Sequence, residues 1–339
     1  MSKDLSGECD AVVIVSFGGP DGPADVMPFL ENVTAGKNIP RNRLLEVAEH
    51  YQHFGGRSPI NEQNTLLQAA VRERLATMGL PLPVYVGNRN WHPLLTDTVA
   101  QMKRDGVRRA LAWVASAYGS YSGCRQYLED IDRARRATGA DAPEIDKIRL
   151  FFNHPLFLHA NAEEVRAATH AWSGVDRASI PLLFTAHSIP ADMAAHCDYE
   201  AQLMDVAGSV AAATGHSGWT LVYQSRSGPP HVPWLEPDVC DVIRARAAQG
   251  CRRLVLAPIG FVSDHLEVLY DLDVEARDTC SALGVHMVRA RAAFHHPAFV
   301  EMVCDLILER VQQRPERPAA GRFGPAPDVC SRGCCRGVL

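Results

Sequence analysis

The sequence has no continuous apolar stretch of the roughly 18 residues that a membrane-spanning helix requires. Its N-terminal region does not resemble a secretory signal, because Asp4, Glu8 and Asp10 interrupt it, and its apolar run is short and lacks a small-residue cleavage site. Basic residues are not in excess: 34 Lys and Arg stand against 39 Asp and Glu, whereas nucleic-acid-binding domains are usually strongly basic. We therefore expect a cytoplasmic protein without a transmembrane segment and without a nucleic-acid partner.

The cysteines are numerous for such a protein. A reducing cytosol disfavours structural disulfides, yet the chain has ten cysteines, three of which crowd its last ten residues. Three thiolates in a flexible arm suit zinc or an iron–sulfur cluster, each of which usually needs four ligands. Free thiols in an irregular tail are the alternative. The other seven cysteines are the candidates for a fourth ligand: Cys9, Cys124, Cys197, Cys240, Cys251, Cys280 and Cys304.

Short apolar runs alternate with helix-like segments along the chain, a pattern that predicts βαβ units and parallel sheets. A length of 339 residues favours two lobes. The strands expected in the first lobe are 11–17, 84–87, 111–116 and 148–152, and those in the second are 182–187, 220–224, 254–259 and 285–288. The fold class is thus α/β, with two similar Rossmann-like lobes that each hold a four-stranded parallel sheet.

The expected domains are an N-terminal lobe (1–160), a C-terminal lobe (161–315) and an irregular cysteine-containing tail (316–339). We also expect the helix near 299–312 to return onto the first lobe. The tail is rich in Pro, Gly and Arg and cannot build a core of its own. In open α/β sheets, ligands bind beyond the carboxyl ends of the strands, so the loops at these ends are the candidate sites.

One such loop begins at His187, the last residue of the expected strand PLLFTAH. A neutral imidazole accepts a proton near pH 7 or binds a metal. A single histidine is more often structural, so this interpretation needs support from elsewhere.

That support comes from the segment GFVSDHLEVLYDLDVE. Glu267, Asp271 and Glu275 are spaced i, i+4 and i+8 and would form one acidic stripe on a helix. Repulsion between like charges weakens a helix at this spacing, whereas a divalent cation bound by the carboxylates would offset it. A solvated acidic face is the alternative, but interleaved leucines indicate partial burial.

Two further segments carry weaker signals. Prolines flank Trp234 in VPWLEP and suggest a rigid apolar wall against which a flat aromatic ligand could lie. The glycine-rich segments SFGGP, which contains Phe17, and HFGGRSPIN, which contains Ser58, permit close approach of a ligand. A packed loop and ordinary turns explain these segments equally well.

Taken together, these residues resemble the ferrochelatase family, whose members insert ferrous iron into a porphyrin. The matching pieces are SFGGP, HFGGRSPIN, FTAHSIP, YQSRSGPPHVPWLEPDV and GFVSDHLEVLYDLD, in the family's order and over nearly the whole chain up to residue 312. The resemblance implies two lobes with a porphyrin cleft between them. It makes His187 the catalytic base and iron ligand, Glu267 its acidic partner, and Asp271 and Glu275 an acidic path, often on a π-helix.

The sequence looks most like the Gram-positive branch that metallates coproporphyrin III. The resemblance makes Phe17, Ser58, Tyr127 and Trp234 porphyrin-binding residues, with Ser58 and Tyr127 contacting propionates. Many members of this branch have a tyrosine where this chain has Phe17, which cannot ligate iron.

Some ferrochelatases carry a [2Fe–2S] cluster held by three C-terminal cysteines and one internal cysteine. The tail resembles that arrangement, with Cys330, Cys334 and Cys335 as ligands, Cys124 as the favoured internal ligand and Cys197 as the second choice. Ligation to Cys124 is expected to fix the tail to the first lobe.

We therefore predict a monomeric enzyme of haem biosynthesis that binds porphyrin and Fe²⁺ and contacts other haem-pathway enzymes transiently. The alternatives are a related chelatase for another metal or for protoporphyrin IX, and a non-catalytic haem-binding protein of two lobes.

Overall fold

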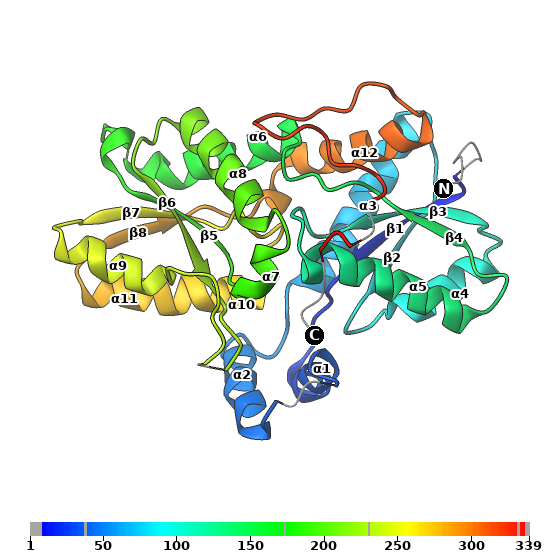
Figure 1. Cartoon of the computed structure of the whole chain (residues 1–339), viewed down its shortest axis with the longest axis horizontal. Coiled ribbons are helices and arrows are strands. Elements are labelled where there is room, and N and C mark those ends of the chain that lie inside the picture. The colour runs from blue at the N-terminus through cyan, green and yellow to red at the C-terminus, as the bar shows by residue number, and fades with distance from the viewer. Residues whose placement is uncertain (1–8, 37–38, 173, 230, 331–332, 336–339) are drawn as a thin grey trace. The chain divides into compact units, whose positions relative to one another are not determined.

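The computed structural model describes residues 9–36, 39–172, 174–229, 231–330 and 333–335 (Figure 1). The chain forms two compact units. Unit 1 comprises 1–115, 126–148 and 303–315, and unit 2 comprises 116–125, 149–302 and 316–339. This division differs from the continuous domains expected above, because 116–125 and the tail belong to unit 2 and most of the last helix belongs to unit 1.

Unit 1 is built on a four-stranded parallel sheet of order β2-β1-β3-β4. Its strands are β1 (Ala11–Ser16), β2 (Val84–Asn88), β3 (Arg109–Val114) and β4 (Glu144–Lys147). Its helices are α1 (Val26–Val33), α2 (Arg41–His53), α3 (Ile60–Thr77), α4 (Leu95–Arg104) and α5 (Gln126–Thr138), and α12 (Pro297–Val311) enters it from unit 2. Apolar side chains of β1 and β3 pack against α4 and α5 to form the core of one face.

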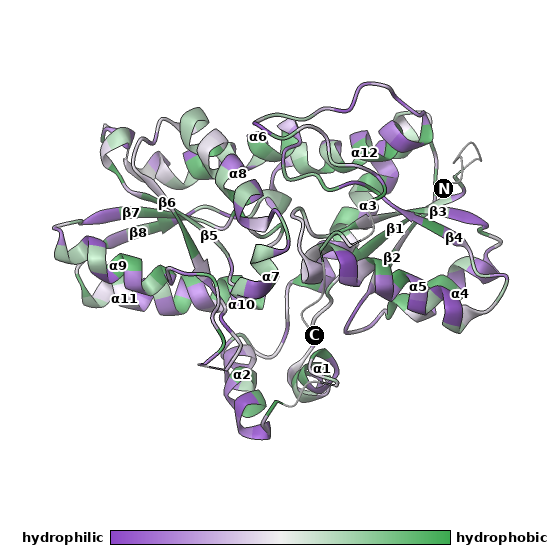
Figure 2. Ribbon diagram, in the orientation of Figure 1, coloured by the Kyte–Doolittle hydropathy of each residue, from purple (hydrophilic) through white to green (hydrophobic). Residues whose placement is uncertain are grey.

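Unit 2 repeats the same strand order, β6-β5-β7-β8, again with all strands parallel. Its strands are β5 (Leu182–His187), β6 (Trp219–Gln224), β7 (Arg253–Ala257) and β8 (His286–Arg289). Its main helices are α6 (Pro155–Thr169), α7 (Ala191–Ala195), α8 (Tyr199–Thr214), α9 (Val239–Ala248), α10 (Leu266–Val268) and α11 (Arg277–Ala282). Helices cover both faces of each sheet (Figure 1), which explains the near-continuous apolar strands, drawn in green in Figure 2.

The predicted fold class, two parallel four-stranded α/β lobes, is therefore confirmed. One expected strand is wrong. The segment 148–152 is a buried connection, whereas the strand is β4, an edge strand with half-exposed side chains. Phe151 and Phe152 are buried against other aromatic rings of unit 2, including Phe157 and Phe323. The apolar run thus reflects packing between side chains and not membership of a sheet.

Two π-helices interrupt the α-helical pattern of unit 2, namely Tyr121–Arg125 and Leu269–Ala276. Helices of this type are rare and often occur at functional sites. No helix among the described residues is long and apolar enough to cross a membrane.

The tail forms no helix or strand over its described part, as expected, but it is fixed to unit 2 by hydrogen bonds. The buried Asn153 amide donates to the carbonyls of Phe323 and Gly324, each at 3.0 Å. The backbone N–H of Arg322 donates to the Asp205 carboxylate at 3.1–3.2 Å. The tail is therefore anchored by protein contacts that involve no thiol.

Candidate active site

His187 lies at the carboxyl end of β5, where a parallel sheet presents its ligand-binding edge. Its Nδ1 atom is 2.5 Å from the Ser188 carbonyl oxygen. A carbonyl oxygen can only accept, so we place the ring proton on Nδ1, which leaves the Nε2 lone pair as the acceptor. The Tyr199 hydroxyl donates to the His187 carbonyl at 3.0 Å and fixes the backbone at this position.

Glu267 comes from the segment that follows β7, and its Oε2 atom is 3.9 Å from His187 Nε2. This is an ion-pair distance and not a direct hydrogen bond. Both side chains are partly exposed, with 32% and 46% of their side-chain surface accessible. The structure thus brings together the two residues singled out from separate parts of the sequence, and leaves both accessible to a ligand.

His265 is a further residue of this group, and the sequence analysis did not single it out. Its ring packs edge-on against Phe261 at 5.2 Å. Burial lowers the pKa of His265, while the Glu267 carboxylate acts in the opposite direction. Its position two residues before Glu267, in the motif SDHLE, is the signal that could have identified it.

The acidic stripe lies on the π-helix Leu269–Ala276 and the short helix before it. Val268, Leu272 and Ala276 are fully buried against the sheet of unit 2. These apolar positions repeat at i, i+4 and i+8, and each follows one acidic residue of the stripe. Because these three apolar side chains pack against the sheet, the acidic side chains that precede them are held on a different side of the helix.

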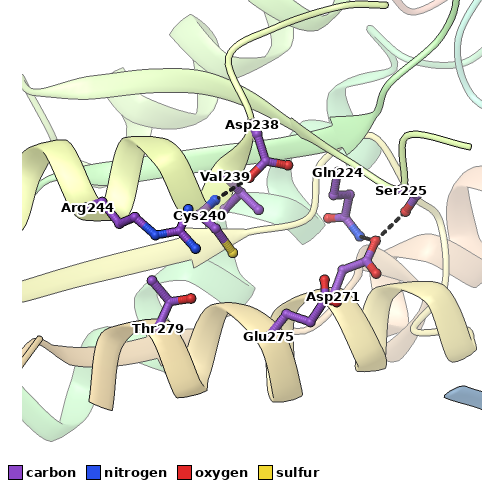
Figure 3. Close-up of a pocket in the computed structure, with 9 residues that line it drawn as sticks. All are labelled: Gln224, Ser225, Asp238, Val239, Cys240, Arg244, Asp271, Glu275 and Thr279. Atoms are coloured by element: carbon purple, nitrogen blue, oxygen red, sulfur yellow. Dashed lines mark hydrogen bonds between the residues drawn. The ribbon is translucent and has the colours of Figure 1, made fainter. Parts of the chain in front are cut away.

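Asp271 and Glu275 line a cavity of about 370 Å³ (Figure 3), whereas Glu267 is not among its lining residues. The carboxylate of Asp271 accepts hydrogen bonds from the Gln224 amide at 3.1 Å and from the Ser225 hydroxyl. The expected single stripe is thus divided between two neighbouring places. Glu267 faces His187, and the other two carboxylates face the cavity.

The pKa of Asp271 is raised to about 7. Burial is the largest cause, the charges of Glu267 and Glu275 add to it, and the hydrogen bonds from Ser225 and Gln224 oppose the shift. A carboxyl group with this pKa exchanges a proton readily at neutral pH. The cavity therefore contains a group that can receive and release protons.

Asp273, two residues further along, points away from this cavity because residues two apart on a helix face nearly opposite directions. Its carboxylate accepts three hydrogen bonds from the Arg289 guanidinium at 2.8–3.0 Å, two of them from Nε and one from Nη2. Arg289 also donates to Asp264 at 2.8 Å, and His295 lies 3.1 Å from the same carboxylate. These ion pairs join the π-helix to the end of β8 and to the loop after β7.

Trp234 belongs to a segment that pairs with the residues after His187. The Ser188 hydroxyl donates to the Leu235 carbonyl at 2.8 Å, and Pro190 and Trp234 form an isolated antiparallel bridge. Gly228 lies so close to the indole that a Cβ atom there would be 2.2 Å from Trp234 Nε1. Trp234 is thus held beside the His187 loop, as a wall residue requires.

The remaining expected porphyrin-binding residues are in unit 1. Ser58 is buried, its N–H donates to the Pro20 carbonyl at 2.8 Å, and it contacts the turn that follows Phe17. Tyr127 is also buried, and Arg89 lies over its ring at 3.6 Å.

Arg89 is a cation that the sequence analysis missed. Its guanidinium Nε donates to the Asp130 carboxylate at 2.5 Å, and its backbone N–H donates to the Ser16 carbonyl at the end of β1.

The cysteines form a second group in unit 2. Three tail cysteines and two internal ones line one cavity of about 760 Å³: Cys124, Cys197, Cys330, Cys334 and Cys335. The two adjacent tail sulfurs, of Cys334 and Cys335, are 3.5 Å apart, and none of the ten cysteines is in a disulfide. Within the described ranges, no three His, Cys, Asp or Glu side chains form a group that could hold a metal ion. Cys124 and the tail belong to the same unit, unit 2, whereas the sequence led us to expect Cys124 in the first lobe.

The two-unit fold is that of the chelatases. A multi-domain protein from Deinococcus radiodurans, described as similar to chelatases, superposes with a TM-score of 0.53 at 16% identity over 88% of this chain and 55% of its own. The sirohydrochlorin chelatase SirB of Bacillus subtilis gives 0.50 at 9% identity over 90% of this chain and 96% of its own.

Sequence similarity is more specific than the fold. The sequence model of the Ferrochelatase family matches residues 9–311. The chain is 55% identical to the ferrochelatase of Rhodopirellula baltica, over 96% of this chain and 93% of that protein. It is 49% identical to the coproporphyrin III ferrochelatase of Nocardia farcinica, over 96% of each chain. The chain belongs to the ferrochelatase family, and it is an enzyme of metal insertion.

The raised pKa of Asp271 predicts a pH-dependent stability. The unfolded carboxyl titrates near 3.9 and the folded one near 7. Between these values the folded state holds the proton that the unfolded state has lost, so stability falls as pH rises and levels off above the folded pKa. Asp271→Asn should remove this contribution. The difference between the melting temperatures at pH 5 and pH 8 should therefore be smaller in the variant than in wild type. An equal difference in the two proteins would contradict the assignment of the raised pKa to Asp271.

The ion pairs of Arg289 predict that Asp273 fixes the π-helix. Asp273→Asn keeps the side-chain shape but removes the charge, which should cost about 1–3 kcal/mol of folding free energy. It should also slow metal insertion, because Asp271 and Glu275 share the same helix. Asp278→Asn, on the exposed side of α11, is the matched control and should change neither property. Wild-type turnover by a destabilised Asp273→Asn protein would show that the ion pairs serve stability alone.

Proposed function

We propose that the protein inserts Fe²⁺ into coproporphyrin III and so produces coprohaem in haem biosynthesis. The observation that carries the proposal is the pair of His187 and Glu267 at the carboxyl end of β5. Several of the most similar relatives, including those of Nocardia farcinica and Mycobacteroides abscessus, are named coproporphyrin III ferrochelatases.

The reaction replaces two pyrrole N–H protons by one Fe²⁺ and moves no electron, so the protein must supply proton acceptors near the ring. His187 Nε2 is the first acceptor in this mechanism, since Nδ1 is committed to the Ser188 carbonyl. Glu267 stabilises the imidazolium that forms, at the 3.9 Å separation observed. A positioned general base of this kind contributes about 10²–10⁴-fold.

Asp271 and Glu275 continue the route from this pair. Because the pKa of Asp271 is about 7, its carboxylate can take up the second proton and release it again at neutral pH. Carboxylate oxygens are also suitable ligands for a hydrated divalent cation that moves toward the porphyrin. The lining of their cavity, with two carboxylates and the Gln224 amide, supports this role.

Substrate carboxylates need donors, and unit 1 offers candidates. Ser58 and Tyr127 are the proposed propionate contacts, with Phe17 and Trp234 as apolar contacts to the ring. Arg89 stands over the Tyr127 ring and adds positive charge beside it. These assignments rest on the resemblance and on the position of each residue at or near the carboxyl ends of β1, β2 and β5.

We also propose a [2Fe–2S] cluster held by Cys330, Cys334, Cys335 and Cys124. The donor set suits the group in number, because one cavity is lined by five thiols and a cluster needs four thiolates, but no three of the described side chains form a group that could hold a metal ion. When bound, the cluster would connect the tail covalently to the π-helix Tyr121–Arg125. Metal insertion moves no electron, so the proposal gives the cluster no step in the reaction.

Replacement of the acid–base pair tests the mechanism. His187→Ala should lower the rate of Fe²⁺ or Zn²⁺ insertion by at least about 10²-fold, because the pyrrole proton loses its acceptor. Glu267→Gln should lower kcat with little change in KM for porphyrin. His170→Ala, an exposed histidine at the end of α6, is the control and should retain full activity. Turnover near the wild-type rate in His187→Ala would overturn the mechanism, whereas haem binding without any turnover in wild type would favour a non-catalytic haem-binding protein.

Substrate choice is tested by comparing kcat/KM for coproporphyrin III and protoporphyrin IX. The tetracarboxylate should be preferred. Ser58→Ala and Tyr127→Phe should each raise KM for it by about tenfold, the usual effect of one lost hydrogen bond to a charged group. Tyr85→Phe, whose hydroxyl bonds to Asp105 elsewhere in unit 1, should have no effect. Equal or better kcat/KM with protoporphyrin IX would reject the coproporphyrin assignment while leaving the ferrochelatase activity intact.

A further inference from the structure

We propose that Tyr118 and Tyr199 are positioning residues for metal insertion, which together hold His187 and the loop that packs against its ring. The inference rests on the proposed role of His187 as the proton acceptor. Both tyrosines are buried in unit 2, with 2% and 6% of their surface exposed. Their hydroxyl groups donate to two backbone carbonyls at the carboxyl edge of the sheet.

Strand pairing holds this edge only in part. β5 and β7 are neighbours, and their ladder pairs residues 182–184 with residues 255–257, where β7 ends. His187 lies beyond the last of these pairs. Past the ladder, the Gly260 N–H donates to the Thr185 carbonyl at 3.0 Å. The rest of the loop after β7 is held relative to His187 by contacts from other elements.

The two hydroxyl groups supply such contacts on both sides. Tyr199, the first residue of α8, donates to the His187 carbonyl at 3.0 Å. Tyr118 donates at 2.8 Å to the carbonyl of Ile259, in the loop after β7. Two residues further along that loop, the Phe261 ring lies 6.4 Å from the His187 ring. One tyrosine therefore fixes the backbone of His187, and the other fixes the loop against which its imidazole packs.

The two tyrosines also contact each other. Their rings are nearly perpendicular, at 85°, with centroids 6.1 Å apart. The Tyr118 ring stacks on Phe152 at 6.1 Å and meets Phe157 edge-on at 6.4 Å. In a close-packed interior, neither ring can shift without its neighbours. Burial raises the pKa of both phenols, so both hydroxyl groups remain donors at neutral pH.

The origin of Tyr118 in the chain supports a role beyond packing. It lies in 116–125, the segment that follows β3 of unit 1 and yet belongs to unit 2. A phenylalanine would fill the same space without a buried hydroxyl group that needs a partner. Both hydroxyl groups instead find their partners on the backbone beside His187 and on the loop that packs against it.

The experiment measures kcat and KM for Zn²⁺ insertion into the better of coproporphyrin III and protoporphyrin IX. It compares wild type with Tyr118→Phe, Tyr199→Phe and the double variant, in which each change keeps the ring and removes one donor. We expect kcat to fall by about tenfold in each single variant and by about a hundredfold in the double variant, because a displacement of about 1 Å can cost that much. KM for the porphyrin should not change.

The matched control is Tyr223→Phe. Tyr223 is also buried in unit 2, but its hydroxyl bonds to the Glu200 carboxylate at 3.1 Å and not to the backbone beside His187. This variant also loses one buried hydrogen bond and should keep the wild-type kcat.

A second set of variants separates positioning from a general loss of structure. In His187→Ala there is no imidazole to position, so Tyr199→Phe should lower the residual rate by less than about twofold in this background, since coupled residues are not additive. A purely structural role would lower the rate equally in both backgrounds. Thermal unfolding shows that each variant is folded at the assay temperature.

The outcomes separate this inference from the proposed function. An inactive His187→Ala protein together with unchanged kcat in both tyrosine variants would overturn the inference and leave the proposed function intact. A rise in KM at constant kcat would assign the tyrosines to porphyrin binding, and equal effects in the two backgrounds would make them structural, so either result would also overturn it. Turnover near the wild-type rate by His187→Ala would reject the proposed mechanism and this inference with it.

Discussion

The ion pairs of Arg289 with Asp264 and Asp273 connect the segments that form the candidate site of unit 2. They join the end of β8, the loop after β7 and the π-helix. Arg289 is largely buried, and removal of either partner would leave an uncompensated buried charge, which is strongly destabilising. Two contacts fix the orientation of the π-helix. One is the ion pair of Asp273 with Arg289, and the other is the packing of Val268, Leu272 and Ala276 against the sheet. Because Asp271 and Glu275 share that helix, their orientation follows from both.

A π-helix also explains why the acidic residues do not act as one group. The sequence predicts a continuous stripe, since i, i+4 and i+8 positions share a face of an α-helix. In the structure Glu267 faces His187 while the next two carboxylates line a separate cavity. This division keeps the Glu267 carboxylate at an ion-pair distance from His187. It also gives Asp271 a buried site with a pKa near neutrality.

Much of the fold could be read from the sequence because parallel strands buried on both faces leave long apolar runs. This holds for β1 and β5, and the position of His187 follows directly from the end of β5. It fails for β4, an edge strand whose polar residues give no such signal, while the apolar residues beside it pack as a buried connection. The cavity shared by Cys124 and Cys197 was equally beyond reach, because it depends on how segments distant in sequence come together. The roles of Arg289 and Asp273 depend on contacts between β8 and a helix that no local pattern encodes.

The proton balance of metal insertion requires more than one proton acceptor near the porphyrin. Two protons must leave the porphyrin for each iron that enters, and one imidazole can hold only one of them at a time. A second acceptor must therefore titrate close to neutral pH, since an ordinary carboxylate near pH 4 would be too weak a base. In the proposed mechanism, the buried Asp271 is this second acceptor, and its raised pKa lowers the stability of the fold at high pH. The fold can tolerate that cost because the π-helix is secured on its opposite side by Arg289, away from the groups that exchange protons.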